Sequence, residues 1–288
     1  MLVAALAGVA VVGAAALVAV LVRSPVERPA RSVATKSAAR APVAAVPAGR
    51  QAQAAEKKPP EGMVAVAAGS YVVGCASGNR QCWDDERPAH RVALGRFGIM
   101  VHEVTMEQYD ECAAAGRCPP AGKEPGCTWQ REGEDRHPIN CVSWKAAGGY
   151  CAWRGWRLPS EAEWEAAARG PSQADYPWGS EPASCERALV GSERGGGCGA
   201  GGLLPVGSRQ ADRSWVGAFD LGGSVREWTA SEYAAYPGGK AEAEQRGKVN
   251  RGASWLMEPG QASTSHTRFA DEPGAARLDL GFRCAVDL

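Results

Sequence analysis

The chain has 288 residues, of which 32 are basic and 32 acidic, so its formal net charge is zero. A protein that binds nucleic acid needs a basic surface excess, and this balanced composition argues against such a partner. No serine–histidine–aspartate arrangement and no phosphate-binding glycine loop stands out in the sequence.

The first 22 residues, Met1–Val22, carry no charged side chain. About 20 apolar residues are needed to cross the hydrocarbon core of a bilayer. A cleaved signal peptide has an apolar region of roughly 7–15 residues behind a basic stretch, and this segment fits neither feature. Residues 1–22 are therefore predicted to be a transmembrane anchor or signal-anchor.

Two opposing signals indicate on which side of the membrane the rest of the chain lies. Several Lys and Arg residues follow the span, and the positive-inside rule would place them in the cytoplasm. Ten cysteines, an even number without a zinc-binding pattern, favour disulfides and an oxidising compartment. We give the cysteines more weight and expect a membrane-anchored domain in the periplasm or the extracellular space.

The composition changes twice along the chain. Residues 23–62 are rich in Ala and Pro and contain no aromatic residue, so they cannot bury enough apolar surface to fold and are predicted to be a linker. Residues 63–288 have the composition of a globular protein and are long enough for one domain with a substantial core.

Three helices are predicted from their capping residues. Each begins after a Ser or Thr whose side-chain oxygen accepts a hydrogen bond from a backbone N–H of the first turn, and each ends at a glycine. Gln108 and Glu163 complete capping boxes in two of them. The helices are expected from Thr105 to near Gly116, from Ser143 to Gly155 and from Ser160 to Gly170.

The remaining regular structure is expected to be short strands joined by long loops. Glycine, proline and serine are abundant between Pro171 and Pro237, which predicts ordered loops there. Strands are expected at Val64–Ala67, Tyr71–Val73 and Arg91–Leu94, near Val249–Leu256, and at Phe282–Val286.

Eight segments, taken together and in order, carry a family resemblance. They are "HRVAL" at His90, "EVTMEQYDEC" at Glu103, "HPINCVSWKAAGGYCAWRGWRLPSEAEWEAAARG" at His137, "YPWG" at Tyr176, "PVGS" at Pro205, "FDLGGSVREW" at Phe219, "NRGASW" at Asn250 and "GFRC" at Gly281. Residues 63–288 resemble the formylglycine-generating enzyme, or sulfatase-modifying-factor, family. The resemblance implies an α+β fold, a C-type-lectin-like variant that is disulfide-rich and has little regular secondary structure.

The same resemblance bears on catalysis. The family's enzymes oxidise a client cysteine to formylglycine with copper held by two cysteine thiolates, which are soft ligands suited to copper(I). Met257 stands where the first of these cysteines is expected, and no second cysteine appears before Cys284. Copper is therefore not expected at the usual site.

Cysteine pairing is only partly indicated. The resemblance implies a disulfide between Cys151 and Cys284. The other eight cysteines can pair as near neighbours, 75 with 82, 112 with 118, 127 with 141 and 185 with 198, although sequence alone leaves the connectivity open.

Other metals are implied more weakly. Family members include iron-dependent oxygenases with three histidines, but this chain has only His90, His102, His137 and His266, two of them inside framework motifs. The family's calcium loop reads "GSVREW" here, so Ser224 and Glu227 are candidate ligands of a weak calcium site.

These observations predict a membrane-tethered, extracytoplasmic domain that does not form formylglycine and instead binds a peptide or protein client. Trp255, His266 and Arg268 lie in the segment that would line the family's substrate groove and are the candidate binding residues. The alternative is a divergent metal-dependent oxidase or oxygenase that uses His and Met. A carbohydrate-binding module is a third interpretation, based only on analogy of fold.

Overall fold

The computed structural model describes residues 57–76, 82–242, 246–260 and 264–288. The predicted anchor at residues 1–22 and most of the predicted linker lie outside this range. Within the described ranges, every helix is too short or too polar to cross a membrane.

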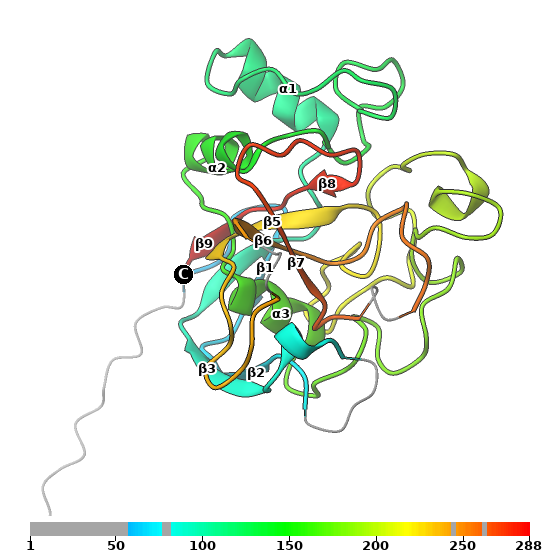
Figure 1. The fold of residues 1–288 in the computed structure, drawn as a ribbon. Coiled ribbons are helices and arrows are strands. Elements are labelled where there is room, and N and C mark those ends of the chain that lie inside the picture. The colour runs from blue at the N-terminus through cyan, green and yellow to red at the C-terminus, as the bar shows by residue number, and fades with distance from the viewer. Residues whose placement is uncertain (1–56, 77–81, 243–245, 261–263) are drawn as a thin grey trace, which may run out of the picture. The chain divides into compact units, whose positions relative to one another are not determined.

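Three α-helices form where the capping residues predict them (Figure 1). They are α1 (Met106–Ala114), α2 (Trp144–Trp153) and α3 (Glu161–Arg169), with Thr105, Ser143 and Ser160 as their N-cap residues. The capping boxes that Gln108 and Glu163 complete are both present. Gly170 follows α3 at a φ of 63°, a backbone conformation that favours glycine.

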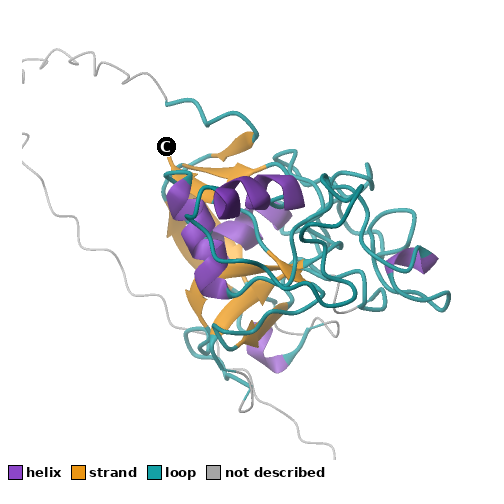
Figure 2. Cartoon of the chain, turned by 90° about the horizontal axis from the view of Figure 1, so that it is seen from above, coloured by secondary structure: helices purple, strands orange, loops and turns teal. Residues whose placement is uncertain are grey.

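In the part of the chain that the structure describes, nine short strands form three sheets among long loops (Figure 2). One sheet has the order β1 (Met63–Val66), β4 (Phe97–Met100), β9 (Ala285–Asp287), all antiparallel. A second pairs β2 (Gly69–Val73) with β3 (His90–Leu94). The third has the order β7 (Arg268–Asp271), β6 (Lys248–Arg251), β5 (Arg226–Glu232), β8 (Leu280–Gly281), with β5 and β8 parallel.

Several strands differ from the sequence expectation. The strand expected near Val249–Leu256 ends at Arg251, because Gly252 turns the chain at a φ of 87°. The segment Phe282–Val286 is not one strand, since only its last two residues belong to β9. Four strands, β4, β5, β7 and β8, were not predicted.

The four-stranded sheet has a different helix on each face (Figure 1). Successive side chains of a strand point to opposite faces. In β5, the Trp228 indole donates to the carbonyl of Val142 just before α2, 3.0 Å away. Its neighbour Glu227 points the other way and accepts from the Trp164 indole of α3 at 2.8 Å. Both tryptophans are fully buried, as expected for core anchors.

All ten cysteines are in disulfides. Cys151 of α2 is joined to Cys284 just before β9, across a sequence separation of 133 residues. The other pairs are those of near neighbours: Cys75–Cys82, Cys112–Cys118, Cys127–Cys141 and Cys185–Cys198. The bridge between Cys185 and Cys198 fixes part of the loop region that follows α3.

Candidate functional site

The segment after β6 reaches the protein surface at Leu256. Trp255 is buried, and its indole donates to the carbonyl of Leu278 at 3.2 Å. The carbonyl of Met257 accepts from the backbone N–H of Gly191 at 2.7 Å. Between these anchored residues, Leu256 keeps 47% of its surface exposed. The chain therefore holds one apolar side chain outward at the position next to Met257.

A groove with a volume of about 520 Å³ adjoins this leucine, and we call it the Leu256 groove. Its walls come from four separate parts of the chain, so no local sequence pattern indicates the groove. Its apolar lining is Pro125, Leu256, Ala276 and Leu278 with the Cys127–Cys141 disulfide, and its charged lining is Glu124, Arg277 and Asp279.

Two of the three charged side chains that line the groove form ion pairs with other residues of the domain. Arg277 contacts Asp271 at 2.5 Å, and Asp279 is paired with Arg226 at 3.0 Å. Those two groups have internal partners. Glu124 is exposed and forms no ion pair within the described ranges. The groove is therefore apolar at its centre with one unpaired negative charge at its rim.

The three residues predicted to bind a client have different locations. Trp255 lies beneath the Leu256 groove. His266 and Arg268 are fully buried in the core, where Glu86 contacts the His266 Nδ1 at 2.9 Å and Glu161 contacts both ends of the Arg268 guanidinium. These contacts give His266 and Arg268 a structural role in this state, and a role in client binding stays a prediction.

Arg268 belongs to a buried ion-pair network that connects the four-stranded sheet to α3. Glu161 also contacts Arg251 at 3.1 Å, and Glu165 contacts Arg251 at 2.6 Å and Arg169 at 2.8 Å. Burial alone would raise the pKa of Glu165, but Arg251 and Arg169 outweigh it and hold that pKa below its ordinary value.

The candidate calcium ligands Ser224 and Glu227 lie near two other buried acids, Glu103 and Asp220. The Glu227 carboxylate accepts from the Arg283 guanidinium at 2.7 and 2.8 Å and also from the Trp164 indole, so its oxygens are already occupied. Ser224 is buried at a φ of 69°. Glu227 is therefore a poor calcium ligand in this arrangement.

Glu103 is the unsatisfied member of this acidic group. It is fully buried, and its carboxylate makes no hydrogen bond of good geometry, although the nearby Ser224 hydroxyl lowers its pKa somewhat. Burial raises the pKa of Glu103 well above its ordinary value, the charge of Asp220 adds to this, and Arg283 opposes it. A carboxyl group in such a position holds a proton or attracts a cation.

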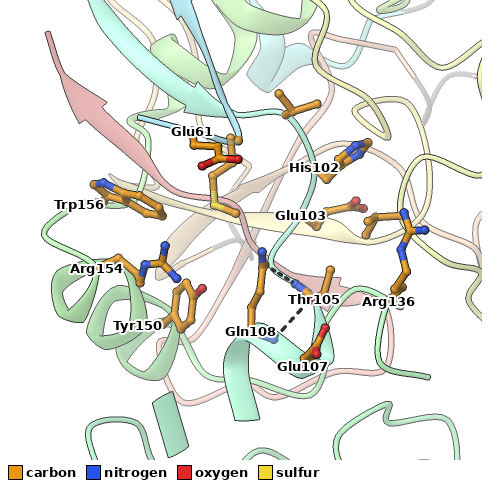
Figure 3. Close-up of a pocket in the computed structure, with 14 residues that line it drawn as sticks. Glu61, His102, Glu103, Thr105, Glu107, Gln108, Arg136, Tyr150, Arg154 and Trp156 are labelled. Atoms are coloured by element: carbon orange, nitrogen blue, oxygen red, sulfur yellow. Dashed lines mark hydrogen bonds between the residues drawn. The ribbon is translucent and has the colours of Figure 1, made fainter. Parts of the chain in front are cut away.

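A second cavity of about 340 Å³ lies next to Glu103, between α1, α2 and the end of β4 (Figure 3). Arg154, Tyr150 and Trp156 lie on one side, and His102 and Arg136 on the other (Figure 3). The Tyr150 hydroxyl is buried without a hydrogen-bond partner. Because both arginines belong to the lining together with the acids Glu61 and Glu107, the cavity has no single sign of charge.

The four histidines do not assemble into a metal site. Across the described ranges, only two clusters place three His, Cys, Asp or Glu ligand atoms within 4.8 Å of one another. One is Cys75, Cys82 and His266, and the other is Glu124, Cys127 and Cys141. Each contains at most one histidine, so the three-histidine arrangement is not formed.

Residues 49–288 match the sulfatase-modifying factor enzyme 1-like domain. The chain belongs to this family. The fold is accordingly the formylglycine-generating-enzyme fold, α+β with few helices and five disulfides.

Relatives of this sulfatase-modifying-factor chain include proteins with different described activities. It is 39% identical over 176 residues to the "Inactive C-alpha-formylglycine-generating enzyme 2" of Bos taurus, covering 58% of this chain and 54% of the relative. It is 30% identical over 258 residues to the hercynine oxygenase of Mycobacterium tuberculosis, covering 76% and 59%. The chain thus spans little more than half the length of either relative.

Among solved structures, PvdO from Pseudomonas aeruginosa is similar to this sulfatase-modifying-factor chain. The two share 28% sequence identity with a TM-score of 0.64, and the match covers 78% of this chain and 94% of PvdO.

Proposed function

We propose that this domain binds an extended peptide segment of a client protein in the Leu256 groove and does not form formylglycine. The observation that carries the proposal is the exposed Leu256 beside Met257, at the position where the family resemblance places a copper-binding cysteine. All ten cysteines are in disulfides, so no thiolate is available there to hold copper. Similarity to a relative described as inactive supports the same reading.

The lining of the groove defines the chemistry of the client. Leu256, Leu278 and Pro125 offer an apolar seat for one apolar side chain. Glu124 is the unpaired charge at the rim, whereas Arg277 is already bound to Asp271. The preferred peptide therefore has an apolar residue next to a basic one.

Selection of random peptides on the immobilised domain tests this proposal. Binders are expected to combine an apolar with a basic residue, and Leu256→Glu should weaken their binding about 10- to 100-fold, since burying a leucine side chain contributes about 1.5–3 kcal/mol. Trp215→Gln removes the other exposed large apolar side chain and serves as the matched control. Equal binding by wild type and Leu256→Glu would contradict the proposal.

The second candidate function is a metal-dependent oxidase or oxygenase, which the similarity to hercynine oxygenase favours. Metal analysis separates the two functions. Purified protein is expected to contain neither iron nor copper in stoichiometric amount and to consume no oxygen with cysteine-bearing peptides. One equivalent of either metal, together with oxygen uptake, would contradict the binding function and support the oxidase or oxygenase.

We also propose that residues 1–22 tether the domain to a membrane, with the domain in the periplasm or extracellular space. The uncharged segment and the disulfide content support this placement. Protease added to cells whose outer envelope has been made permeable should degrade the domain, and protection until the cytoplasmic membrane is broken would contradict the placement.

A weak calcium site near Ser224 is a further part of the proposal. Glu103 and Asp220 are the carboxylates that support this site, because both oxygens of Glu227 already accept hydrogen bonds from Arg283. Calcium at ten times its Kd should raise the Tm by about 3–5 °C. The rise should disappear in Glu103→Gln, and a rise of equal size in that variant would place calcium elsewhere.

A further inference from the structure

The cluster of Cys75, Cys82 and His266 lies apart from the Leu256 groove and has the composition of a metal site. Cys75 and Cys82 form a disulfide, and the His266 Nε2 lies 3.9 Å from the Cys82 Sγ. In a tetrahedral zinc site a thiolate sulfur and an imidazole nitrogen lie about 3.6 Å apart, given their usual bond lengths to zinc. The nitrogen is therefore already close to the position that such a site requires.

The orientation of His266 supports the same role. Glu86, which is fully buried, lies 2.9 Å from Nδ1, and a carboxylate can only accept, so Nδ1 carries the proton. The lone pair is then on Nε2, which faces the sulfur of Cys82. A carboxylate that orients a histidine through its other nitrogen is the usual support of a metal-binding imidazole.

A fourth ligand is also present, and the two cysteine Cα atoms are widely separated. The Asp175 Oδ1 lies 4.0 Å from the His266 Nε2, and Asp175 is partly exposed. The Cα atoms of Cys75 and Cys82 are 6.3 Å apart, the widest separation among the five disulfides. Two sulfurs that bind one zinc lie about 3.8 Å apart, so they must separate after the disulfide is reduced.

We propose that the Cys75–Cys82 disulfide is the oxidised form of a zinc site completed by His266, with Asp175 as the fourth ligand. A dithiol reductant supplies two electrons and two protons, breaks the S–S bond and becomes a disulfide itself, leaving two cysteine thiols. Zn²⁺ then displaces one proton from each thiol and binds two thiolates and the imidazole. The site binds zinc only when reduced, and oxidation releases the metal.

The other cluster, Glu124 with Cys127 and Cys141, provides an internal comparison. It also combines a disulfide with a third ligand, but it has no imidazole, and Glu124 is exposed. Borderline metals such as zinc favour nitrogen and sulfur ligands together. Zinc should therefore distinguish the two pairs after both have been reduced.

The test is differential alkylation of the full chain after reduction with a phosphine, which becomes a phosphine oxide. Zn²⁺ should protect Cys75 and Cys82 from alkylation but not Cys127 and Cys141, with one equivalent bound. Co²⁺ used as the probe should give thiolate-to-metal charge-transfer absorption. His266→Gln should weaken Zn²⁺ binding at least tenfold, and Glu124→Gln should leave it unchanged.

Three results would overturn the zinc site. The first is equal alkylation of Cys75 and Cys82 with and without Zn²⁺ in the reduced wild type. The second is unchanged Zn²⁺ affinity in His266→Gln. The third is loss of native tryptophan fluorescence when this pair is reduced, with Zn²⁺ present. All of these readouts are taken without a client peptide, so their outcome is independent of the proposed client binding.

Discussion

Glu103 shows how a buried side chain can make stability depend on pH. Burial together with the charge of Asp220 raises the pKa of its carboxyl group well above the ordinary value, against the opposing effect of Arg283. In the unfolded chain the group ionises near the ordinary glutamate pKa of about 4.3. Between that value and the raised folded-state pKa, only the unfolded chain loses the proton, so the free energy of unfolding falls as pH rises.

Glu103→Gln should remove this part of the pH dependence. With Ca²⁺ chelated, the variant is expected to match wild type near pH 4 and to exceed it increasingly toward neutral pH. The difference in unfolding free energy should grow by about 1.4 kcal/mol for each pH unit until the folded-state pKa is reached. Urea unfolding at several pH values measures it, and parallel pH profiles for the two proteins would contradict the assignment.

His266 and Arg268 show what a sequence leaves open at the residue scale. Both are polar residues in a segment expected to line a surface groove, yet both are buried because acidic side chains supply their hydrogen-bond partners in the core. Those partners, Glu86 and Glu161, are 180 and 107 residues away in sequence. Local sequence pattern cannot reveal such distant partners.

At the scale of elements, α3 is held to the sheet by charged groups as much as by apolar packing. The helix supplies Glu161 and Glu165, and the strands β6 and β7 supply Arg251 and Arg268. Removing one partner of a buried ion pair leaves an uncompensated charge, which is more costly than losing the pair entirely.

Arg268→Met should therefore destabilise the domain by about 3–5 kcal/mol, measured by urea unfolding. Arg117→Met, at an exposed arginine just after α1, is the control and should change the stability by no more than about 0.5 kcal/mol. A loss below about 1 kcal/mol in Arg268→Met would mean that the network contributes little to stability.

The helices were predictable because their start signals are local, whereas several strands were not. Thr105, Ser143 and Ser160 determine the helix starts through hydrogen bonds within three residues. Strand β5 reads "REWTASE", and its charged residues Arg226 and Glu227 are buried against partners elsewhere in the chain. Its sequence lacks the alternation of apolar and polar residues that marks a half-buried strand.

At the scale of the whole molecule, the disulfides differ greatly in the length of chain that they close. Cys151–Cys284 spans 133 residues, and Cys112–Cys118 spans six. In the chain-entropy model the longer loop contributes roughly 5 kcal/mol and the shorter roughly 2 kcal/mol.

Replacing both cysteines of a pair by alanine should reproduce this order. Cys151→Ala with Cys284→Ala is expected to lower the free energy of unfolding by more than Cys112→Ala with Cys118→Ala does. Urea unfolding of the two double variants provides the comparison. An equal or larger loss in the short-loop variant would show that local packing, rather than chain entropy, determines the effect.

The position of β9 determines when this domain can finish folding during synthesis. Strand β4 lies between β1 and β9, and the backbone of Met100 donates to the carbonyl of Cys284. Until residues 284–287 have left the ribosome, a nascent chain therefore leaves one edge of β4 open and Cys151 without its partner. An open strand edge invites pairing with other chains. The sheet can therefore close only after residues far downstream of β4 have been synthesised.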